Sequence, residues 1–386
     1  MRGLPRNRTT AAAQDTRAIY CCGVVPSSAR RPEWLDPIER LVLAAAREVR
    51  MLAVLTPLDA RQERERLVAD LRAGRRAIPR WTYIRNEHHD LRRALAAAER
   101  ALADEPPAGV AALYLARVRE LVLEAALCAT AGTTELARVA AQRFAGGMES
   151  RAASELCARW LAEAAPPRET TVFESDAATP YSLLSLMRAA VGKAGLPFQV
   201  VPAPSLAPLA ATGERAIYVA TGRQVTQEDA ARTVLHEIEG HARPRVRALC
   251  ARCPLFRVGT ARGADEQEGR ALLLEERAGW LGPSRRRQLA ARHRAVEAMH
   301  DGASFADVAF TLARVHGLDE SEAIVAAERA FRGGDGSRPG LGRERVYLES
   351  FVRVSEHLAR RPNDEQVLSC GQVAVDAVEE LRPFAA

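Results

Sequence analysis

Two histidines stand five residues apart in the segment TVLHEIEGHARPR, which covers residues 233–245. The segment has the periodicity of a helix. On a regular α-helix, residues five apart point about 140° away from each other, whereas residues four apart differ by about 40°. His236 and His241 can therefore reach one partner only if the helix ends, or widens by one residue, between them. Gly240 and Pro244 favour such a break, and single-residue widenings are frequent at functional sites.

The same segment nearly spells the zinc peptidase signature H-E-x-x-H, with Glu237 after the first histidine. Zinc needs a third protein ligand and an open position for water. The downstream helical pattern GADEQEGRALLLEERAGW offers four candidates for the third ligand, and the pattern leaves all of them open: Glu266, Glu268, Glu275 and Glu276. Glu237 suits a general base, acting on a water whose pKa the metal lowers toward ~7. The alternative is a chance pair of histidines on a helix.

Hydrophobic periodicity divides the chain into three parts. Residues 1–32 have no steady period and are predicted to be a disordered extension. Residues 33–166 repeat apolar residues at helical spacing and predict an N-terminal helical region. In residues 167–386, the runs ETTVFES, PFQVVPA and ERAIYVAT predict a small sheet with one covering helix, followed by further helices. We expect an α+β, mostly helical fold with the small sheet beside the helix that carries the histidines.

Composition argues against several classes of partner. The net charge of +6 comes almost wholly from arginine, with Lys193 the one lysine, and no aromatic residues interleave with the arginine runs. We therefore expect no nucleic-acid partner. No apolar run approaches the length of a membrane span, so we expect no membrane partner. Seven scattered cysteines favour reduced thiols and a cytoplasmic protein, and we interpret Cys250 and Cys253 as a structural pair. The oligomeric state stays open.

Four motifs follow one another along the chain. They are HEIEGH, then Gln267-Glu268-Gly269-Arg270-Ala271, then RAFRGG, then RERVYLES. In this order they resemble the H-E-x-x-x-H, Q-E-G-L-A, R-x-x-R-G and K-D-x-x-Y-L motifs of the tyrosine carboxypeptidase family. That family comprises microtubule-associated tyrosine carboxypeptidases and bacterial QEGLA-motif proteins described as flavohaemoglobin expression-modulating. The resemblance covers roughly residues 35–380.

The resemblance implies a zincin-like catalytic domain over residues 167–386. It implies zinc bound by His236, His241 and Glu268, with Glu237 as the base. The implied activity is that of a zinc-dependent metallopeptidase, a carboxypeptidase that hydrolyses a peptide bond near the C-terminus of a peptide or protein substrate.

A carboxypeptidase needs a cation to hold the free C-terminal carboxylate, and a bidentate arginine suits that task. Arg329, Arg332 and Arg343 are the candidates, with a structural ion pair as the alternative for each. Tyr347 is a candidate donor to the oxyanion of the tetrahedral intermediate. Its alternative is a half-buried core tyrosine.

The chain departs from the family pattern at several positions. Glu239 stands where relatives usually have glycine, Pro244 where they commonly have arginine, and Arg270 in place of leucine. Arg343-Glu344 replaces Lys-Asp. We therefore expect a retained metal core with altered pocket walls, and a substrate that need not end in tyrosine. The competing hypotheses are a non-catalytic regulatory or binding protein that keeps the fold, and a dedicated peptide-maturation protease in a biosynthetic pathway.

Overall fold

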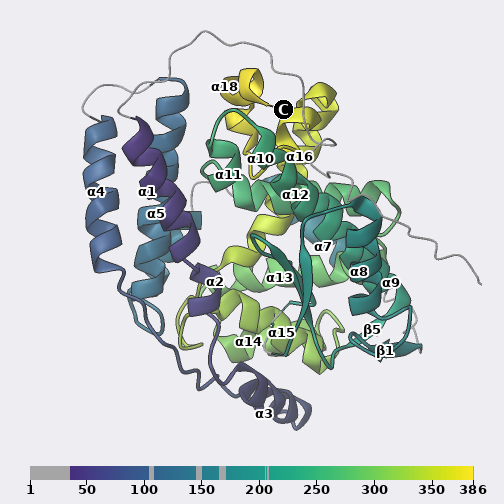
Figure 1. The fold of residues 1–386 in the computed structure, drawn as a ribbon. Helices are drawn as coiled ribbons and strands as arrows, with labels where there is room; N and C mark the ends of the chain where they lie inside the picture. The colour runs from purple at the N-terminus through teal and green to yellow at the C-terminus, as the bar shows by residue number, and fades with distance from the viewer. Residues whose placement is uncertain are drawn as a thin grey trace, which may run out of the picture.

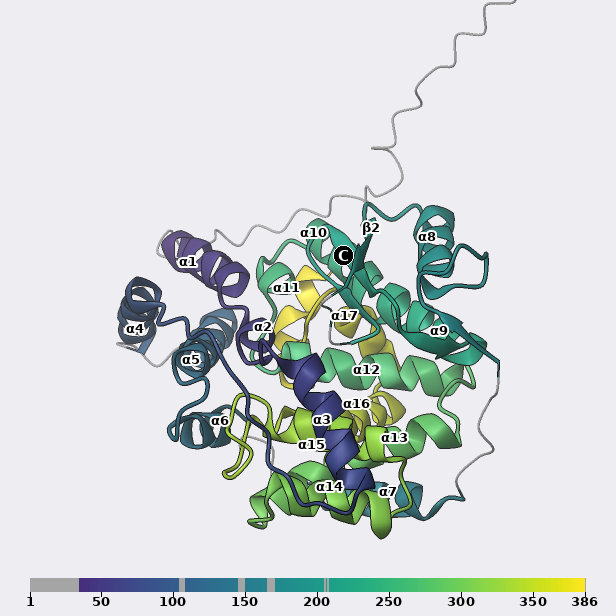
Figure 2. The ribbon, with the colours of Figure 1, turned by 90° about the horizontal axis from the view of Figure 1, so that it is seen from below.

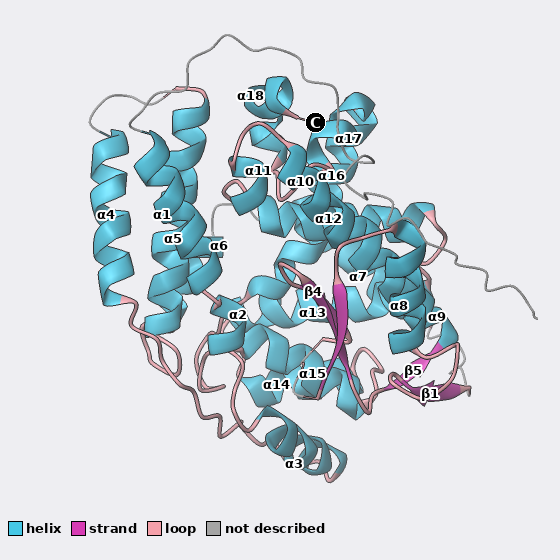
Figure 3. Ribbon diagram, viewed as in Figure 1, coloured by secondary structure: helices cyan, strands magenta, loops and turns pink. Residues whose placement is uncertain are grey.

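The structure is a computed structural model of the 386-residue chain. It describes residues 35–103, 108–144, 150–164, 171–204, 206 and 208–385. These residues form helices accompanied by two small sheets (Figure 3), which confirms the expected α+β, mostly helical fold. The expected extension over residues 1–32 and the expected boundary between residues 166 and 167 lie outside the described residues, so the domain division stays a prediction.

The first part of the chain is built from helices with one apolar face. Their bounds are α1 (Leu35–Glu48), α2 (Met51–Val54), α3 (Ala60–Arg72), α4 (His89–Ala103), α5 (Val110–Ala129), α6 (Leu136–Phe144) and α7 (Arg151–Ala162). Helices α1, α4 and α5 stand side by side (Figure 1). The apolar pattern across α1 and α2 predicts one helix. It is two, because Arg50 leaves the helical conformation at φ −99° and ψ 60°.

The strands form two sheets where the sequence predicted one. β2 (Gln199–Ala203) pairs in parallel with β4 (Ala216–Ala220), and β3 (Ala210–Thr212) pairs antiparallel with the other side of β4. β1 (Val172–Glu174) and β5 (Gln224–Thr226) form a separate antiparallel pair. The sequence pattern missed β3 and β5, because neither stands in a longer run of β-branched and aromatic residues, as the equally short β1 does.

The expected covering helix is α8 (Leu183–Ala194), which packs against β2 and the helix that carries the histidines. Buried side chains join α8, the three-stranded sheet and that helix into one cluster, which includes Met187, Ile217, Val219 and Ile238. The small sheet thus lies beside the histidine helix, as the sequence predicted.

The remainder of the chain is helical, as the view from below shows (Figure 2). Its elements are α11 (Leu255–Val258), α12 (Gly263–Arg277), α13 (Pro283–His300), α14 (Phe305–Arg314), α15 (Glu320–Phe331), η3 (Arg343–Arg345), α16 (Val346–Arg360), η4 (Pro362–Asp364), α17 (Glu365–Leu368), η5 (Val375–Ala377), α18 (Val378–Leu381) and η6 (Arg382–Phe384). Gly269 lets α12 lie against α16, since a Cβ there would meet the Ser350 carbonyl carbon at 2.3 Å. Of the helices that the structure describes, none has both the length and the apolar character needed to cross a bilayer.

Candidate metal centre

The histidine helix changes its winding where the two histidines stand. It begins as α9 (Gln227–Leu235), which Thr226 caps by accepting a hydrogen bond from the Asp229 backbone N–H. Residues His236–Ala242 then form a π-helix, η2, and α10 (Arg243–Cys250) continues from it. Of the two possibilities, an end of the helix or a widening by one residue, the structure shows the widening. Pro244 does not end the helix, because it lies in the first turn of α10, where proline is tolerated.

Gly240 allows the π-helix to lie directly on α12. A Cβ at position 240 would stand 2.7 Å from the Cβ of Ala271, closer than two carbon atoms can approach. Gly240, which the sequence suggested as a break in the helix, is thus the residue at which the π-helix contacts α12. It brings the histidines within reach of the acidic face of α12.

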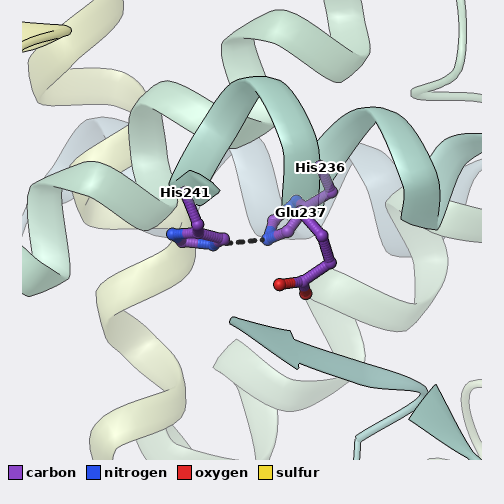
Figure 4. A group of neighbouring side chains, drawn as sticks. All are labelled: His236, Glu237 and His241. Carbon is purple, nitrogen blue, oxygen red and sulfur yellow. Dashed lines mark hydrogen bonds between the residues drawn. The ribbon is translucent and has the colours of Figure 1, made fainter. Parts of the chain in front are cut away.

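The two histidine side chains turn toward each other (Figure 4). Their Nε2 atoms lie 3.2 Å apart. Each Nδ1 faces an acceptor from α12: the Nδ1 of His236 lies 2.7 Å from Glu275 Oε1, and the Nδ1 of His241 lies 2.8 Å from Gln267 Oε1. A neutral imidazole that donates from Nδ1 has a lone pair on Nε2. Two such lone pairs therefore face each other, an arrangement that a shared cation stabilises.

Glu268 completes a group of three ligand atoms. Its Oε2 lies 3.4 Å from the Nε2 of His236 and 3.8 Å from the Nε2 of His241. Ligand atoms about 2.1 Å from a tetrahedral zinc ion stand roughly 3.4 Å from one another. The three distances of 3.2, 3.4 and 3.8 Å fit that geometry. The residues present therefore suit a zinc ion.

The charges of the neighbouring side chains keep the Glu268 carboxylate ionised. Burial opposes the charge of Glu268, but the hydrogen bond from His236 and the charges of His241 and Arg343 outweigh it and hold the pKa of Glu268 well below its usual range. For His236, burial is likewise outweighed by Glu268 and Glu275, which raise its pKa to about 10. The site thus attracts positive charge strongly, and a metal ion competes with the proton for the same nitrogen.

Glu275 is not placed as a ligand but as a partner of His236. Its carboxylate is fully buried, and Arg285 approaches its Oε2 at 3.1 Å. Burial opposes ionisation, yet Arg285, then His236 and Arg232, lower the pKa of Glu275 to about 2. An ionised carboxylate on the far nitrogen of a metal-binding histidine fixes the ring and raises its basicity.

The other two candidates for a third ligand point elsewhere. Glu266 Oε2 accepts a hydrogen bond from the Val375 backbone N–H at 2.6 Å, and its Oε1 lies 3.0 Å from Arg353. Glu276 is exposed at the end of α12. Of the four acidic residues that the sequence left open, Glu268 is the one whose carboxylate meets both histidines.

Glu237 lies close to the ligand atoms from the other side. Its carboxylate and the ligand nitrogens of His236 and His241 lie within 4.8 Å of one another. The side chain points toward a strand below the helix (Figure 4), and Thr212 of β3 donates a hydrogen bond from Oγ1 to Glu237 Oε2 at 2.7 Å. This contact orients the carboxylate while leaving its other oxygen able to accept a proton.

The predicted arginines fall into different environments. Arg343 approaches Glu268 Oε1 at 3.5 Å and Asp265 Oδ1 at 3.7 Å, so it faces the carboxylate that lies beside the two histidines. Arg329 lies 2.8 Å from Glu344 Oε2. Arg332 is buried, with no ion pair or hydrogen bond from its side chain among the described residues. The three arginines are near one another but are not equivalent.

Tyr347 lies next to Arg343. It is buried, and the guanidinium carbon of Arg343 stands 5.7 Å from its ring centroid. Burial and the charge of Glu268 raise the pKa of Tyr347. The charges of Arg343 and Arg329 act in the opposite direction but do not outweigh them. Within the part of the chain that the structure describes, its hydroxyl makes no hydrogen bond. It is therefore a neutral donor close to the ligand group.

Sequence reasoning did not assign roles to Gln267 and Thr212, and it treated Glu275 only as a possible ligand. The signal for Glu275 is its spacing: it follows Glu268 by seven residues, two helical turns, and so lies on the same face of α12. Nothing in the local pattern of β3 marks Thr212. Its partner is 25 residues away in the sequence.

Comparison with known proteins agrees with the motifs. The family model described as microtubule-associated tyrosine carboxypeptidase matches residues 71–386. A search of curated proteins finds no match to this chain.

Proposed function

This chain belongs to the microtubule-associated tyrosine carboxypeptidase family, and on that premise we propose that it is a zinc-dependent carboxypeptidase acting on the C-terminus of a peptide or protein. The observation that carries the proposal is the facing pair of histidine nitrogens, 3.2 Å apart, with Glu268 beside them and both Nδ1 positions occupied by acceptors. His236, His241 and Glu268 are the proposed zinc ligands.

A zinc ion held by His236, His241 and Glu268 would supply a water of lowered pKa and would polarise the carbonyl to be attacked. Glu237 takes the proton of the attacking water through its free oxygen, while Thr212 holds the other oxygen. Glu237 then returns the proton to the leaving amine. Tyr347 donates from its hydroxyl to the oxyanion that develops on the attacked carbonyl.

The substrate is held on two sides. β3 is an edge strand of its sheet, and an extended peptide can add to such an edge through backbone hydrogen bonds. On the other side, we propose that Arg329 and Arg332 bind the C-terminal carboxylate. Arg343 faces Glu268 and acts by positioning that ligand.

The metal assignment is tested by elemental analysis of the purified full-length chain. We expect about one zinc ion per chain, and a large loss of zinc in His236→Ala and Glu268→Ala. His293→Ala is the matched control, because His293 is a buried histidine away from the ligand group that faces Glu297. Zinc binding that survives both ligand substitutions would overturn the assignment.

The activity is tested with a library of peptides that have free C-termini, read by mass spectrometry. The wild type should shorten peptides from the C-terminus, and Glu237→Gln should not, although it should still bind zinc. Equal trimming by both proteins would show that Glu237 is not the base. A zinc-loaded wild type that trims nothing would favour a non-catalytic binding protein.

We also propose a cytoplasmic location. It is supported by the two buried free thiols of Cys128 and Cys157, because cysteines of proteins that mature in oxidising compartments are usually paired. Fractionation of cells that produce the protein would test it.

A further inference from the structure

The two oxygens of the Glu268 carboxylate face different partners. Oε2 lies 3.4 Å from the Nε2 atom of His236 and 3.8 Å from that of His241. Oε1 instead lies 3.5 Å from Nη2 of Arg343. Because Arg343 stands against Oε1, Glu268 offers one oxygen to the ligand group and not both.

Arg343 is itself paired with Asp265. Asp265 precedes Glu268 by three residues on α12, so both carboxylates lie on one face of that helix. The Nε of Arg343 lies 3.7 Å from Asp265 Oδ1, while its Nη2 faces Glu268. One guanidinium, whose donors stand in a fixed fork, thus spans the two carboxylates. The position of Arg343 against Glu268 therefore depends on where Asp265 stands.

Asp265 is anchored from helices that precede the small sheet in the chain. Arg143 of α6 donates from Nη1 to Asp265 Oδ2 at 3.0 Å, so the two oxygens of Asp265 meet two different arginines. The Nη2 of Arg143 lies 2.9 Å from Glu120 Oε1 and 3.0 Å from Glu124 Oε1, both on α5. Helices α5 and α6 pack on each other, and we call them the α5–α6 pair. Arg143 joins this pair to the first turn of α12.

Glu120 makes a second link between the α5–α6 pair and α12. Its Oε1 accepts a hydrogen bond at 2.8 Å from the backbone N–H of Arg262, the residue just before α12. Arg262 has a φ of 59°, in the left-handed region that few residues other than glycine adopt. The beginning of α12, which carries Asp265 and Glu268, is thus held by the α5–α6 pair at two points.

The contacts between Arg143 and Glu268 are shielded from water. The side chains of Arg143, Asp265 and Arg343 are 3%, 8% and 9% exposed. Exposed ion pairs contribute little, whereas removing one member of a buried pair leaves an uncompensated charge and is strongly destabilising. Asp265 also separates the two guanidinium groups of Arg143 and Arg343. Without its charge, Arg343 would lose the contact that keeps it in place.

We propose that Asp265 is a positioning residue of the proposed metal centre. Anchored by Arg143, it holds Arg343 against Glu268 Oε1, so that Glu268 offers the metal Oε2 alone and does not take the position that water needs. The inference rests on the proposed function. It makes the α5–α6 pair a working part of the metal centre, although neither helix supplies a ligand.

Zinc affinity is the first readout, measured on the full-length chain by competition with a zinc-sensitive dye. Asp265→Asn should weaken zinc binding by about tenfold, as loss of an outer partner of a metal ligand typically does. Asp364→Asn is the matched control, because Asp364 is a buried aspartate whose carboxylate is held by His357 and Arg382. It should bind zinc as the wild type does. Wild-type affinity in Asp265→Asn, or equal losses in the two variants, would overturn the inference.

Arg343→Gln is the background that separates positioning from attraction at a distance. A carboxylate that acts on the metal only through its charge should matter whether or not Arg343 is present. A carboxylate that acts through Arg343 has nothing to hold once that side chain is changed. Asp265→Asn should therefore cause no further loss of zinc affinity in Arg343→Gln. An undiminished loss in that background contradicts the positioning role.

Cobalt reports the coordination itself. Co²⁺ binds the same kinds of nitrogen and oxygen ligand as zinc, and its visible absorption is stronger with four ligands than with five. Once Arg343 no longer holds Oε1, Glu268 can bind through both oxygens, so cobalt-loaded Asp265→Asn should absorb less than the cobalt-loaded wild type. Arg143→Lys keeps the charge but not the fork; it should change the spectrum in the same direction, and it decides the question if Asp265→Asn does not fold. Wild-type spectra in the folded variants would rule the inference out.

The two proposals can fail separately. A wild type that binds neither zinc nor cobalt refutes the metal assignment and this inference together. Zinc binding that depends on His236 and Glu268 but not on Asp265 leaves the proposed function standing and refutes the inference alone.

Discussion

Arg270 donates a hydrogen bond from Nη1 to the backbone carbonyl oxygen of Glu239, 3.2 Å away. In the π-helix, Arg243 N–H donates to Ile238 O, five residues back. The next residue in that pattern would donate to Glu239 O, but it is Pro244, which has no N–H. Arg270 therefore supplies the donor that the proline lacks. Two departures from the family pattern, Arg270 and Pro244, are explained by one contact.

This relationship predicts a coupled pair of substitutions. Arg270→Leu should lower the free energy of unfolding by about 1–3 kcal/mol, because the carbonyl of the half-buried Glu239 loses this charge-assisted hydrogen bond. Pro244→Arg in the same chain should restore part of that loss by returning a backbone N–H. Urea unfolding of both single variants and the double variant measures the coupling. Additive effects would show that the two positions are independent.

Glu275→Gln should weaken zinc binding by roughly 10- to 100-fold, because the carboxylate fixes the ring of His236 and raises its basicity. The neighbouring Glu276→Gln is the control, since Glu276 is exposed and should bind zinc as the wild type does. Competition with a zinc-sensitive dye gives both affinities. Gln267→Ala should act in the same direction through His241.

Thr212→Val should lower kcat by about tenfold to a hundredfold, because Glu237 loses the hydrogen bond that orients it. The zinc content should stay at the wild-type level, since Thr212 does not touch the ligands. Thr212→Ser keeps the hydroxyl and should retain most of the activity. A Thr212→Val protein with unchanged kcat would mean that the base is oriented by other contacts.

Gly240→Ala should destabilise the protein by about 1–3 kcal/mol, since the new Cβ would lie 2.7 Å from that of Ala271. Ala271→Gly in the same chain should relieve the clash. Gly192→Ala is the contrasting control: Gly192 lies inside α8 with no atom within 4 Å of an added Cβ, and alanine should stabilise that helix by about 0.5–1 kcal/mol. The thermal unfolding midpoints of the wild type, Gly240→Ala, the Gly240→Ala/Ala271→Gly double variant and Gly192→Ala decide between these outcomes.

Glu344 should contribute an acid-sensitive part of the stability. Burial opposes its charge, but Arg329, Arg292 and Arg332 lower its pKa from an ordinary 4.5 to about 2. A carboxyl whose pKa is depressed in the folded state stabilises fully above its unfolded pKa, and the contribution is lost as the pH falls toward the folded value. Between about pH 4.5 and 2, the unfolding free energy of Glu344→Gln should therefore fall less steeply than that of the wild type. The unfolding free energies come from denaturant titrations at each pH. If those of the wild type and Glu344→Gln fall in parallel as the pH drops, Glu344 does not have a lowered pKa in the folded protein.

The sequence predicted those parts of the site that depend on spacing along one helix. The five-residue separation of His236 and His241 required the helix to end or to widen between them, and the structure shows the widening. The motifs also indicated the family, which the family comparison confirms. The contacts between elements could not be predicted in this way. Thr212 reaches Glu237 from a three-residue strand, and the pairing of Arg329 with Glu344 depends on how α15 and η3 pack.

The π-helix contains one residue more than an α-helix of the same span. Deleting Glu239 would leave the histidines four apart, on one face of an ordinary helix, so this histidine helix and the H-E-x-x-H type differ by a single residue. A π-helix of seven residues turns through nearly the same angle as an α-helix of six. After the deletion, α9 would therefore keep its packing on α8, and α10 its packing on α11. The two kinds of histidine helix can thus be exchanged without moving the helices that flank the site.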